Sequence, residues 1–316
     1  MKTDLRIVFM GTPDFAVTTL KTLVDNHYNI VGVITAPDKP AGRGRKLQES
    51  AVKQYAKSEG LHVMQPTNLK DETFLSELKA LDANLQIVVA FRMLPEAVWR
   101  MPELGTFNLH ASLLPNYRGA APINWAIING ETQTGVSTFF IDEKIDTGAM
   151  ILQKDVAINK SDNAGSLHDK LMTVGSHLVL ETVKLIAQGD VKTTPQPENA
   201  EIKTAYKLNK ENCKIDWNDT IYNINNKIRG LSPYPAAWCY LENNNTTLDI
   251  KIYEAEIALE NHNFDTGFLI ADKQNIKIAV KEGFIIIKKI KLPGKRLMDT
   301  KSLLNGYQFN NDAKVL

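Results

Sequence analysis

The chain has 316 residues, of which 43% are apolar and 23% are charged, and its formal net charge is +1. This is ordinary globular composition, and the length suffices for one large domain and a smaller one. The near-zero net charge argues against a protein that coats nucleic acid, and no apolar run reaches the roughly 20 residues of a membrane span. The opening residues lack a signal peptide's apolar core, so we expect a cytoplasmic protein without membrane contact.

The first half of the chain alternates short apolar runs with helical patterns. Strand-like runs cover residues 5–10, 29–35, 61–65 and 85–91, and each is followed by a helical pattern, at 15–26, 48–60, 73–84 and 94–102. This alternation predicts an α/β fold with a doubly wound, mostly parallel sheet that carries helices on both faces. The first turn, Gly11-Thr12-Pro13-Asp14, lacks the GxGxxG spacing of a dinucleotide site, which argues against such a cofactor.

The second half of the chain changes character after a helical stretch at 164–188. Residues 189–205 are polar and contain two prolines, which is typical of a linker. Residues 206–316 hold strand-like runs with Asn- and Gly-rich breaks, the pattern of a small antiparallel, OB-like barrel. We therefore predict a first domain at 1–188 and a second at 206–316.

The charge of each domain and the spacing of the two cysteines indicate which binding partners and metal sites to expect. Residues 1–202 contain 20 Lys and Arg against 23 Asp and Glu, whereas residues 203–316 contain 17 against 13. A mildly basic second domain suits an acidic macromolecule, although such a difference also occurs in domains that bind nothing charged. Cys213 and Cys239 have no CxxC spacing, so we expect two ordinary thiols and no metal site.

The residues that carry chemistry lie between 105 and 148. If Phe107-Asn108-Leu109-His110 ends a strand, Asn108 and His110 point to the same face, and Asp146-Thr147-Gly148 can return a carboxylate to it. Acyl transfer to an amine needs an oxyanion donor and a group that moves protons, which a carboxamide and an imidazole supply. A Ser-His-Asp triad is disfavoured because Ser112 follows His110 too closely in the chain.

The same stretch resembles the folate-dependent formyltransferase family. That family shows Asn-x-His, then Ser-Leu-Leu-Pro-x-x-Arg-Gly, then a Gly-x-Ser/Thr segment that leads to Asp-x-Gly. Here these motifs are Asn108 to His110, Ser112 to Gly119, Gly135, and Asp146 to Gly148. Further segments, among them GTPDFA at 11–16 and IRGLSPYPAAW at 228–238, resemble the branch of the family that formylates initiator Met-tRNA.

The resemblance implies a fold, a donor and a set of site residues. The fold would be a Rossmann-like formyltransferase domain with an appended barrel, and the donor 10-formyltetrahydrofolate, with no tightly bound cofactor and no metal. The implied residues are Asn108, His110 and Asp146 for catalysis; Ser112, Leu113, Leu114, Pro115, Phe91, Arg92 and Met93 for folate; Phe15 for the methionine side chain; and Arg43, Arg45, Lys46, Lys207, Lys210 and Arg229 for tRNA.

The loop from Phe91 to Pro95 departs from the family pattern, and the basic loop at 38–46 helps to distinguish a tRNA substrate from a small amine. Many members carry Tyr-Gly-x-x-Leu-Pro where this chain has Phe91 to Pro95, one residue shorter and with Arg92 in place of glycine. The loop at 38–46 is basic and rich in proline and glycine, so we expect a projecting arm. The resemblance implies that this arm enters the tRNA acceptor stem. The alternative is an enzyme that formylates a small amine such as an amino sugar nucleotide. A tRNA-binding protein with an inactive site is disfavoured because all three catalytic residues are present.

Overall fold

The computed structural model describes residues 3–41, 46–197 and 201–316. The chain divides into two compact units that interleave along the sequence. Unit 1 contains Met1–Gly119, Thr134–Ala157 and His168–Thr204, and unit 2 contains Ala120–Gln133, Ile158–Leu167 and Ala205–Leu316. Among the helices in the described part of the chain, none has the length and apolar character needed to cross a membrane.

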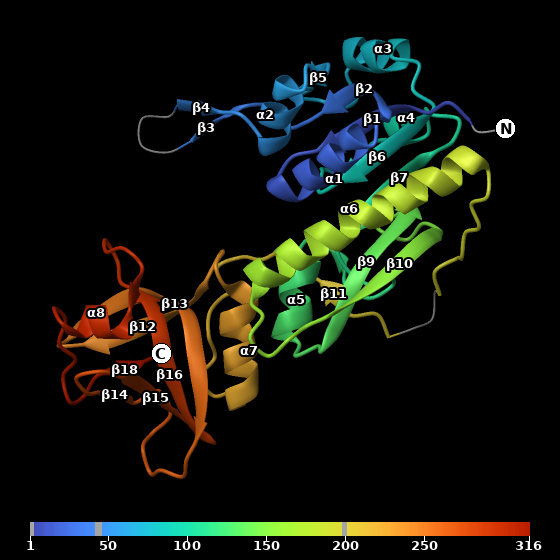
Figure 1. The fold of residues 1–316 in the computed structure, drawn as a ribbon. Coiled ribbons are helices and arrows are strands. Elements are labelled where there is room, and N and C mark those ends of the chain that lie inside the picture. Colours follow the sequence, from blue (N-terminus) through green and yellow to red (C-terminus); the bar gives the residue numbers. More distant parts are fainter. Residues whose placement is uncertain (1–2, 42–45, 198–200) are drawn as a thin grey trace. The chain divides into compact units, whose positions relative to one another are not determined.

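Unit 1 is built on a seven-stranded sheet with the order β10-β9-β7-β6-β1-β2-β5 (Figure 1). Pairing is parallel from β5 through β7, and β9 runs antiparallel to β7. The strands are β1 (Arg6–Gly11), β2 (Asn29–Ile34), β5 (Val63–Met64), β6 (Leu85–Val89), β7 (Thr106–His110), β9 (Gln133–Phe140) and β10 (Met150–Ala157). The predicted doubly wound, mostly parallel α/β sheet is confirmed.

The central strands are nearly continuous apolar runs because helices cover both of their faces. All five residues of β6 are buried, and so are five of the six in β1. The helices are α1 (Asp14–Asp25), α2 (Ala51–Ser58), α3 (Glu72–Ala80), α4 (Glu96–Trp99) and α6 (Ala164–Gln188). Ser50 and Asp71 cap α2 and α3 by accepting from backbone N–H groups in the first turn.

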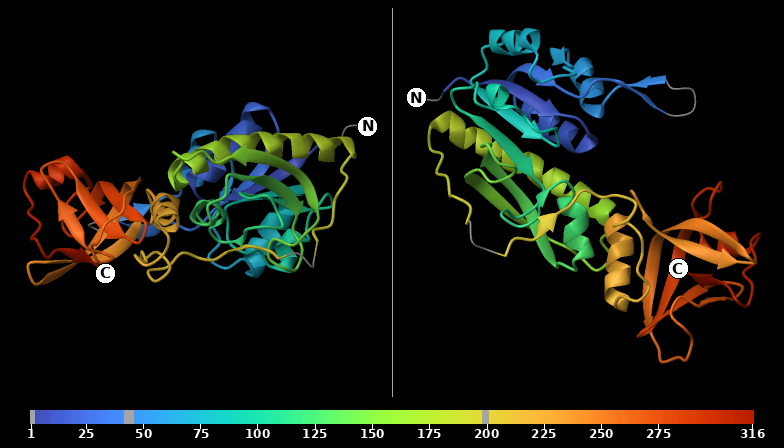
Figure 2. Two further views of the ribbon diagram at one scale, coloured as in Figure 1. Left: turned by 90° about the horizontal axis from the view of Figure 1, so that it is seen from below. Right: turned by 180° about the vertical axis from the view of Figure 1, so that it is seen from behind.

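Helix α6 lies along one face of this sheet (Figure 2). A Cβ at its Gly175 would lie 2.8 Å from a methyl carbon of Leu109 in β7, so a larger residue there would push the helix away from the strand. The contact settles the orientation of β7. Leu109 faces α6, and its neighbours Asn108 and His110 therefore face the opposite side of the sheet.

Unit 2 is a nearly closed antiparallel barrel. Its strands follow the order β14-β15-β16-β13-β12-β18, and β17 (Met298–Asp299) pairs with β16. The six strands are β12 (Ala237–Asn243), β13 (Thr246–Leu259), β14 (Leu269–Ala271), β15 (Ile276–Val280), β16 (Gly283–Lys291) and β18 (Lys314–Val315). Hydrogen bonds from Leu269 N to Ala313 O and from Val315 N to Gly267 O join the two edges, which confirms the predicted barrel.

Three helices belong to unit 2: α5 (Pro122–Ile128), α7 (Ile221–Leu231) and α8 (Thr300–Leu304). The side-chain amide of Asn124 in α5 donates to Gly230 O in α7 at 2.8 Å. Gly230 lets the two helices approach closely, because a Cβ there would lie 2.7 Å from the Ile128 side chain. Unit 2 thus includes a helix that precedes the barrel by more than eighty residues in the chain.

Two short strand pairs complete the described structure. The flanks of the predicted basic loop pair as β3 (Lys39–Ala41) and β4 (Lys46–Gln48). Farther along, β8 (Arg118–Gly119) pairs with β11 (Thr204–Ala205), at the end of the segment predicted as a linker. Thr194 in that segment also exchanges two backbone hydrogen bonds with Met150.

Candidate active site

Strand β7 presents Asn108 and His110 on the face away from α6. The side-chain oxygen of Asn108 is buried and has no hydrogen-bond partner within the described part of the chain. Buried carboxamides are nearly always paired in folded proteins, so an unpaired one at a strand end calls for an external partner. Turning the amide over would present its N–H groups at the same place.

The His110 ring is held between a carbonyl and a carboxylate. Its Nε2 lies 2.9 Å from Tyr117 O, and its Nδ1 lies 3.9 Å from Asp146 Oδ2. Because a carbonyl oxygen only accepts, Nε2 must carry the proton and donate it, which leaves Nδ1 facing the carboxylate. The side chains of His110 and Asp146 are only 7% and 13% exposed, so little water screens the pair.

Asp146 stands in a tight turn whose geometry depends on its neighbours. Its φ is +56°, in the left-handed region, and its Oδ2 accepts from Gly119 N at 3.0 Å. At Gly148, a Cβ would lie 1.7 Å from Phe140 O, so only glycine fits this position. The turn therefore aims the carboxylate toward β7, as the Asp-Thr-Gly pattern predicts.

The segment Ser112 to Pro115, predicted to contact folate, is anchored from behind. Ser112 is fully buried, and its hydroxyl donates to Asn116 O at 2.6 Å. Ser137 Oγ accepts from Leu114 N and donates to Ser112 O. Gln153 adds a bond from its side-chain amide to Leu114 O at 2.9 Å. These contacts fix the loop backbone and occupy the Ser112 hydroxyl within the loop.

The short loop that begins at Phe91 directs its arginine away from the loop. The Arg92 guanidinium donates to Thr67 O at 2.9 Å and to Pro66 O. It also lies 5.6 Å from the centre of the Phe91 ring. Met93 is 71% exposed. Arg92, which stands where many family members have glycine, is thus bound to the neighbouring loop at Pro66 and Thr67. The guanidinium is therefore held away from the backbone of residues 91–93, which can contact a ligand.

Phe15 lies at the start of α1. It is buried, and its ring packs edge-on against His168 of α6 with centroids 5.3 Å apart. The turn before it is close-packed, because a Cβ at Gly11 would lie 2.5 Å from the Ala16 Cβ. The predicted contact between Phe15 and a methionine side chain stays a prediction.

The residues predicted to bind tRNA differ in their surroundings. Arg43 and Arg45 lie outside the described residues, and Lys46 is placed only as the first residue of β4. Lys207 is exposed, and Lys210 Nζ lies 3.5 Å from Asp249 Oδ2 and 4.7 Å from the centre of the Trp238 ring. The Arg229 guanidinium donates to Asp162 O at 2.9 Å and to Asn159 O at 3.4 Å, in a partly buried position. Burial lowers the pKa of Arg229.

No sequence pattern gave a role to four residues that support this site, of which Ser137 is the serine of the Gly-x-Ser/Thr motif: Tyr117, Ser137, Gln153 and Gln196. Each residue acts through a hydrogen bond within a turn or between segments that lie far apart in the chain. Helical and strand periodicity in the sequence does not reveal such contacts. Gln196 in particular lies inside the polar, proline-containing stretch that predicts a linker. Nothing in the sequence around Gln196, apart from that composition, indicates a role in the site.

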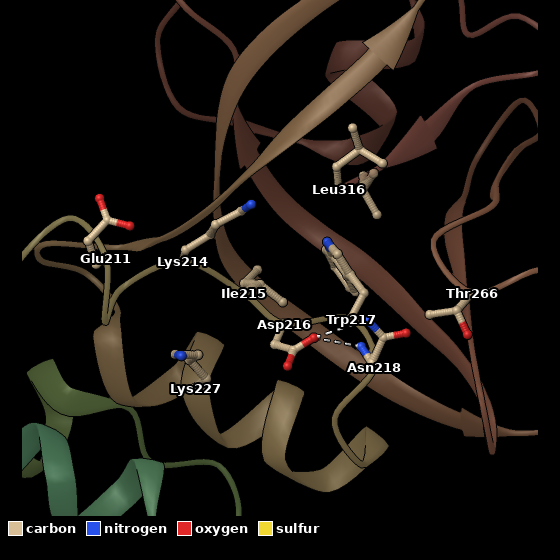
Figure 3. A pocket seen from close by; sticks show the side chains of 10 residues that line it. Glu211, Lys214, Ile215, Asp216, Trp217, Asn218, Lys227, Thr266 and Leu316 are labelled. Atoms are coloured by element: carbon tan, nitrogen blue, oxygen red, sulfur yellow. Dashed lines mark hydrogen bonds between the residues drawn. The ribbon is translucent and has the colours of Figure 1, made fainter.

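Within the described ranges, no group of three or more His, Cys, Asp or Glu side chains is placed to hold a metal ion. Unit 2 contains a separate open pocket of about 530 Å³, lined in part by Lys214, Trp217, Lys227 and Leu316 (Figure 3). This pocket includes none of the predicted catalytic or folate residues.

Comparison with known proteins agrees with this geometry. Residues 5–183 match the formyl transferase family model, and residues 207–308 match the model of the formyl transferase C-terminal domain. The chain is 65% identical to a methionyl-tRNA formyltransferase from Flavobacterium johnsoniae over 98% of this chain and 99% of that one. The chain belongs to the methionyl-tRNA formyltransferase family. A relative from Bacteroides fragilis is 53% identical over 99% of this chain and 98% of its own.

Two solved structures of other proteins share the family's fold. The sugar 3N-formyl transferase WlaRD, solved with dTDP and 5-N-formyl-THF, matches with a TM-score of 0.64 at 22% identity, covering 93% of this chain and all of that one. HypX from Aquifex aeolicus, solved with tetrahydrofolic acid, matches with a TM-score of 0.65 at 18% identity over 96% of this chain and 47% of that one. At these identities the comparison establishes the fold alone.

Proposed function

We propose that this protein transfers the formyl group of 10-formyltetrahydrofolate to the α-amino group of methionine on initiator Met-tRNA. The product is formylmethionyl-tRNA, used to begin translation in the cytoplasm. One observation supports the chemistry most directly. His110 Nδ1 lies 3.9 Å from the Asp146 carboxylate, on the sheet face that also carries the unpartnered side-chain oxygen of Asn108. The family membership supports the choice of donor and acceptor.

In the proposed reaction the methionine amine attacks the formyl carbon, and a new C–N bond forms as the carbonyl becomes an oxyanion. The Asn108 amide N–H stabilises that oxyanion, a contact that exists only in the transition state and intermediate. The bond from the formyl carbon to N10 then breaks, and the folate nitrogen takes up the proton that the amine gives up. Overall, one amine proton is exchanged for one formyl group.

His110 and Asp146 would move that proton. The Nε2–H is engaged by Tyr117 O, so the nitrogen available to accept a proton is Nδ1, which faces Asp146 Oδ2. At 3.9 Å the pair is too far apart for a direct hydrogen bond, and a water between them would complete the relay. Both side chains are nearly buried, so bulk water has little access to the pair.

We propose that the donor lies against two backbone segments of unit 1. The backbone of Ser112 to Pro115 is held rigidly by Ser137 and Gln153. The segment from Phe91 to Met93 offers main-chain groups, because Arg92 is already tied to Pro66 and Thr67. A donor bound chiefly through main-chain atoms would tolerate the arginine in place of glycine.

The tRNA contacts are proposed for the basic loop at 38–46 and for exposed lysines of unit 2. Arg43, Arg45 and Lys46 are assigned by their place in the family pattern alone. Lys207 and Lys210 are exposed at 206–210, where phosphate contact is open to them. Arg229 is a weaker candidate, because its guanidinium already serves the carbonyls of Asp162 and Asn159.

The proposal is tested by supplying formyl-labelled 10-formyltetrahydrofolate with methionine-charged initiator tRNA, charged elongator tRNA, or a panel of small amines. We expect label to enter initiator Met-tRNA with a kcat/KM far above that for any other acceptor. Preferential labelling of an amino sugar nucleotide would establish the alternative, a small-amine formyltransferase. Omitting the enzyme controls for spontaneous transfer.

A further inference from the structure

The buried side chain of Gln196 connects two loops that contact His110. It lies in the segment after α6, it is 8% exposed, and it follows the point where Thr194 pairs with Met150. This segment runs beside the turn that holds Asp146. It is therefore part of the structure of unit 1 at this point, whatever role residues 189–205 play as a whole.

All four hydrogen-bonding positions of the Gln196 carboxamide are filled. Its Oε1 accepts from Arg118 Nε at 3.1 Å and from Arg118 Nη2 at 2.6 Å. Its Nε2 donates to Asp146 O at 3.0 Å and to Gly148 O at 2.8 Å. The amide cannot turn over, because its N–H groups would then face the guanidinium donors.

Two of the three residues that Gln196 bonds to, Arg118 and Asp146, lie next to or at a contact of His110. Arg118 follows Tyr117, whose carbonyl accepts from His110 Nε2, and precedes Gly119, whose N–H donates to Asp146 Oδ2. Asp146 is itself the carboxylate next to His110 Nδ1. Gln196 thus links the Arg118 side chain, next to Tyr117, to the backbone of the turn that carries Asp146.

The backbone conformation at Asp146 and at Tyr117 has to be held in place by neighbouring residues. Asp146 and Tyr117 both have positive φ, at +56° and +60°. Side chains other than glycine adopt this region only where the surrounding structure determines it, and such positions cluster at functional sites. A carboxamide that bonds to the carbonyls of Asp146 and Gly148 supplies that restraint.

We propose that Gln196 is a positioning residue for formyl transfer: it fixes the Asp146 carboxylate and the Tyr117 carbonyl on opposite sides of His110. This inference rests on the proposed function of that site. Gln196 touches no reacting atom, and it acts by holding the carboxylate at the distance that the proton relay needs. A misplacement of about 1 Å at a catalytic group can cost on the order of 100-fold in rate.

The test compares Gln196→Met with the unmodified full-length enzyme, using Gln188→Met at the exposed end of α6 as the matched control. Methionine keeps the volume and removes all four hydrogen bonds. We expect kcat to fall about 10- to 100-fold while the KM values for folate and tRNA stay within about threefold. The control should keep full activity. A kcat within twofold of the unmodified enzyme would overturn the proposal.

A second variant and a double variant separate positioning from mere stabilisation. Gln196→Glu keeps the acceptor for Arg118 but places an oxygen against the two carbonyls, so we expect its kcat to fall as far as that of Gln196→Met. Adding Gln196→Met to Asp146→Asn should cost little further rate, because Gln196 acts through Asp146. Fully multiplicative losses would refute the proposal. The unmodified enzyme's acceptor preference, measured in parallel, tests the proposed function independently.

Discussion

At the residue scale, the site combines an unpaired amide with an imidazole whose two nitrogens have different neighbours. Tyr117 O holds Nε2, and Asp146 Oδ2 faces Nδ1 at 3.9 Å. In the proposed reaction, the Nε2 contact holds the ring in place and the Nδ1 side takes part in proton transfer. Transition-state roles of this kind predict losses in kcat and not in substrate affinity.

We expect His110→Ala and Asn108→Ala each to lower kcat by about 100- to 1,000-fold, because each removes a group assigned to the transition state. The KM for the folate donor should change little. Steady-state kinetics at saturating tRNA measures both, and His62→Ala, an exposed histidine of the same unit, is the control. Near-normal kcat in either variant would show that the catalytic assignment is wrong.

The two thiols should be inert in the folded protein. Cys213 and Cys239 are both buried, and burial raises the pKa of both, that of Cys239 to about 12. The reactive form is the thiolate, so a raised pKa leaves very little of it at pH 8. We expect no reaction with a thiol-specific reagent until denaturant is added, when two thiols should react. Rapid modification without denaturant would contradict the burial.

At the element scale, the two ends of α7 serve different purposes. The N-terminus is capped by Thr220, whose side chain accepts from Asn223 N. Near its C-terminus, the Arg229 guanidinium donates to the carbonyls of Asn159 and Asp162. The helix thereby secures a segment of unit 2 that precedes it by some sixty residues in the chain.

Arg229→Met should destabilise the protein, because it leaves two partly buried carbonyls without a charged donor. Loss of such hydrogen bonds costs about 1–3 kcal/mol. Lys227→Met, on the same helix, should have a much smaller effect on Tm. Thermal unfolding of both full-length variants checks this. An unchanged Tm for Arg229→Met, together with weakened tRNA binding, would instead support the original assignment of Arg229 to tRNA.

At the scale of the whole molecule, the two compact units do not follow a single cut in the chain. Helix α5 lies before β9 in sequence, yet it belongs to unit 2, where Asn124 bonds to Gly230 and Ile128 packs against the barrel's apolar core. Three lysines of the barrel strands form close ion pairs. Lys288, Lys289 and Lys314 each lie within 3.0 Å of a glutamate carboxylate.

A fragment of residues 1–205 should be less stable than unit 1 of the full chain. It retains α5 but lacks α7, so the face of α5 around Ile128 would be exposed to water. Exposed apolar surface of this kind favours aggregation. We expect a lower unfolding temperature and concentration-dependent association in sedimentation experiments. A monodisperse fragment with an unchanged unfolding temperature would contradict the assignment of α5 to unit 2.

Salt dependence tests the proposed tRNA contacts on the intact protein. Each phosphate contact made by a lysine contributes about 0.7 to 0.9 to the log–log slope of affinity against salt concentration. Lys207→Glu and Lys210→Glu should each reduce the slope by about one contact and weaken initiator and elongator tRNA alike, because phosphates carry no sequence information. Glu substitution of Lys289 is the control, because its ion pair with Glu254, at 2.7 Å, is closer than that of Lys210 with Asp249, at 3.5 Å. Unchanged slopes would refute the assignment of these lysines.

The sequence by itself determined what depends on local pattern. Alternating apolar runs and helical periods predicted the parallel sheet and the barrel, and the period of two in a strand placed Asn108 and His110 on one face. The motifs between Asn108 and Gly148 also predicted the family. These features are written in residues that lie next to one another, so no tertiary contact is needed to read them.

Only the tertiary structure decided which distant segments meet. The approach of Asp146 to His110, the bonds of Gln196 to Arg118 and Gly148, and the packing of α5 against α7 all join residues separated by tens of positions. Arg92 and Arg229, which the resemblance assigns to folate and to tRNA, bind backbone carbonyls in the fold. A short sequence motif specifies which side chains are present. Which distant residues they bond to depends on strand order and turn geometry, and no short motif specifies these.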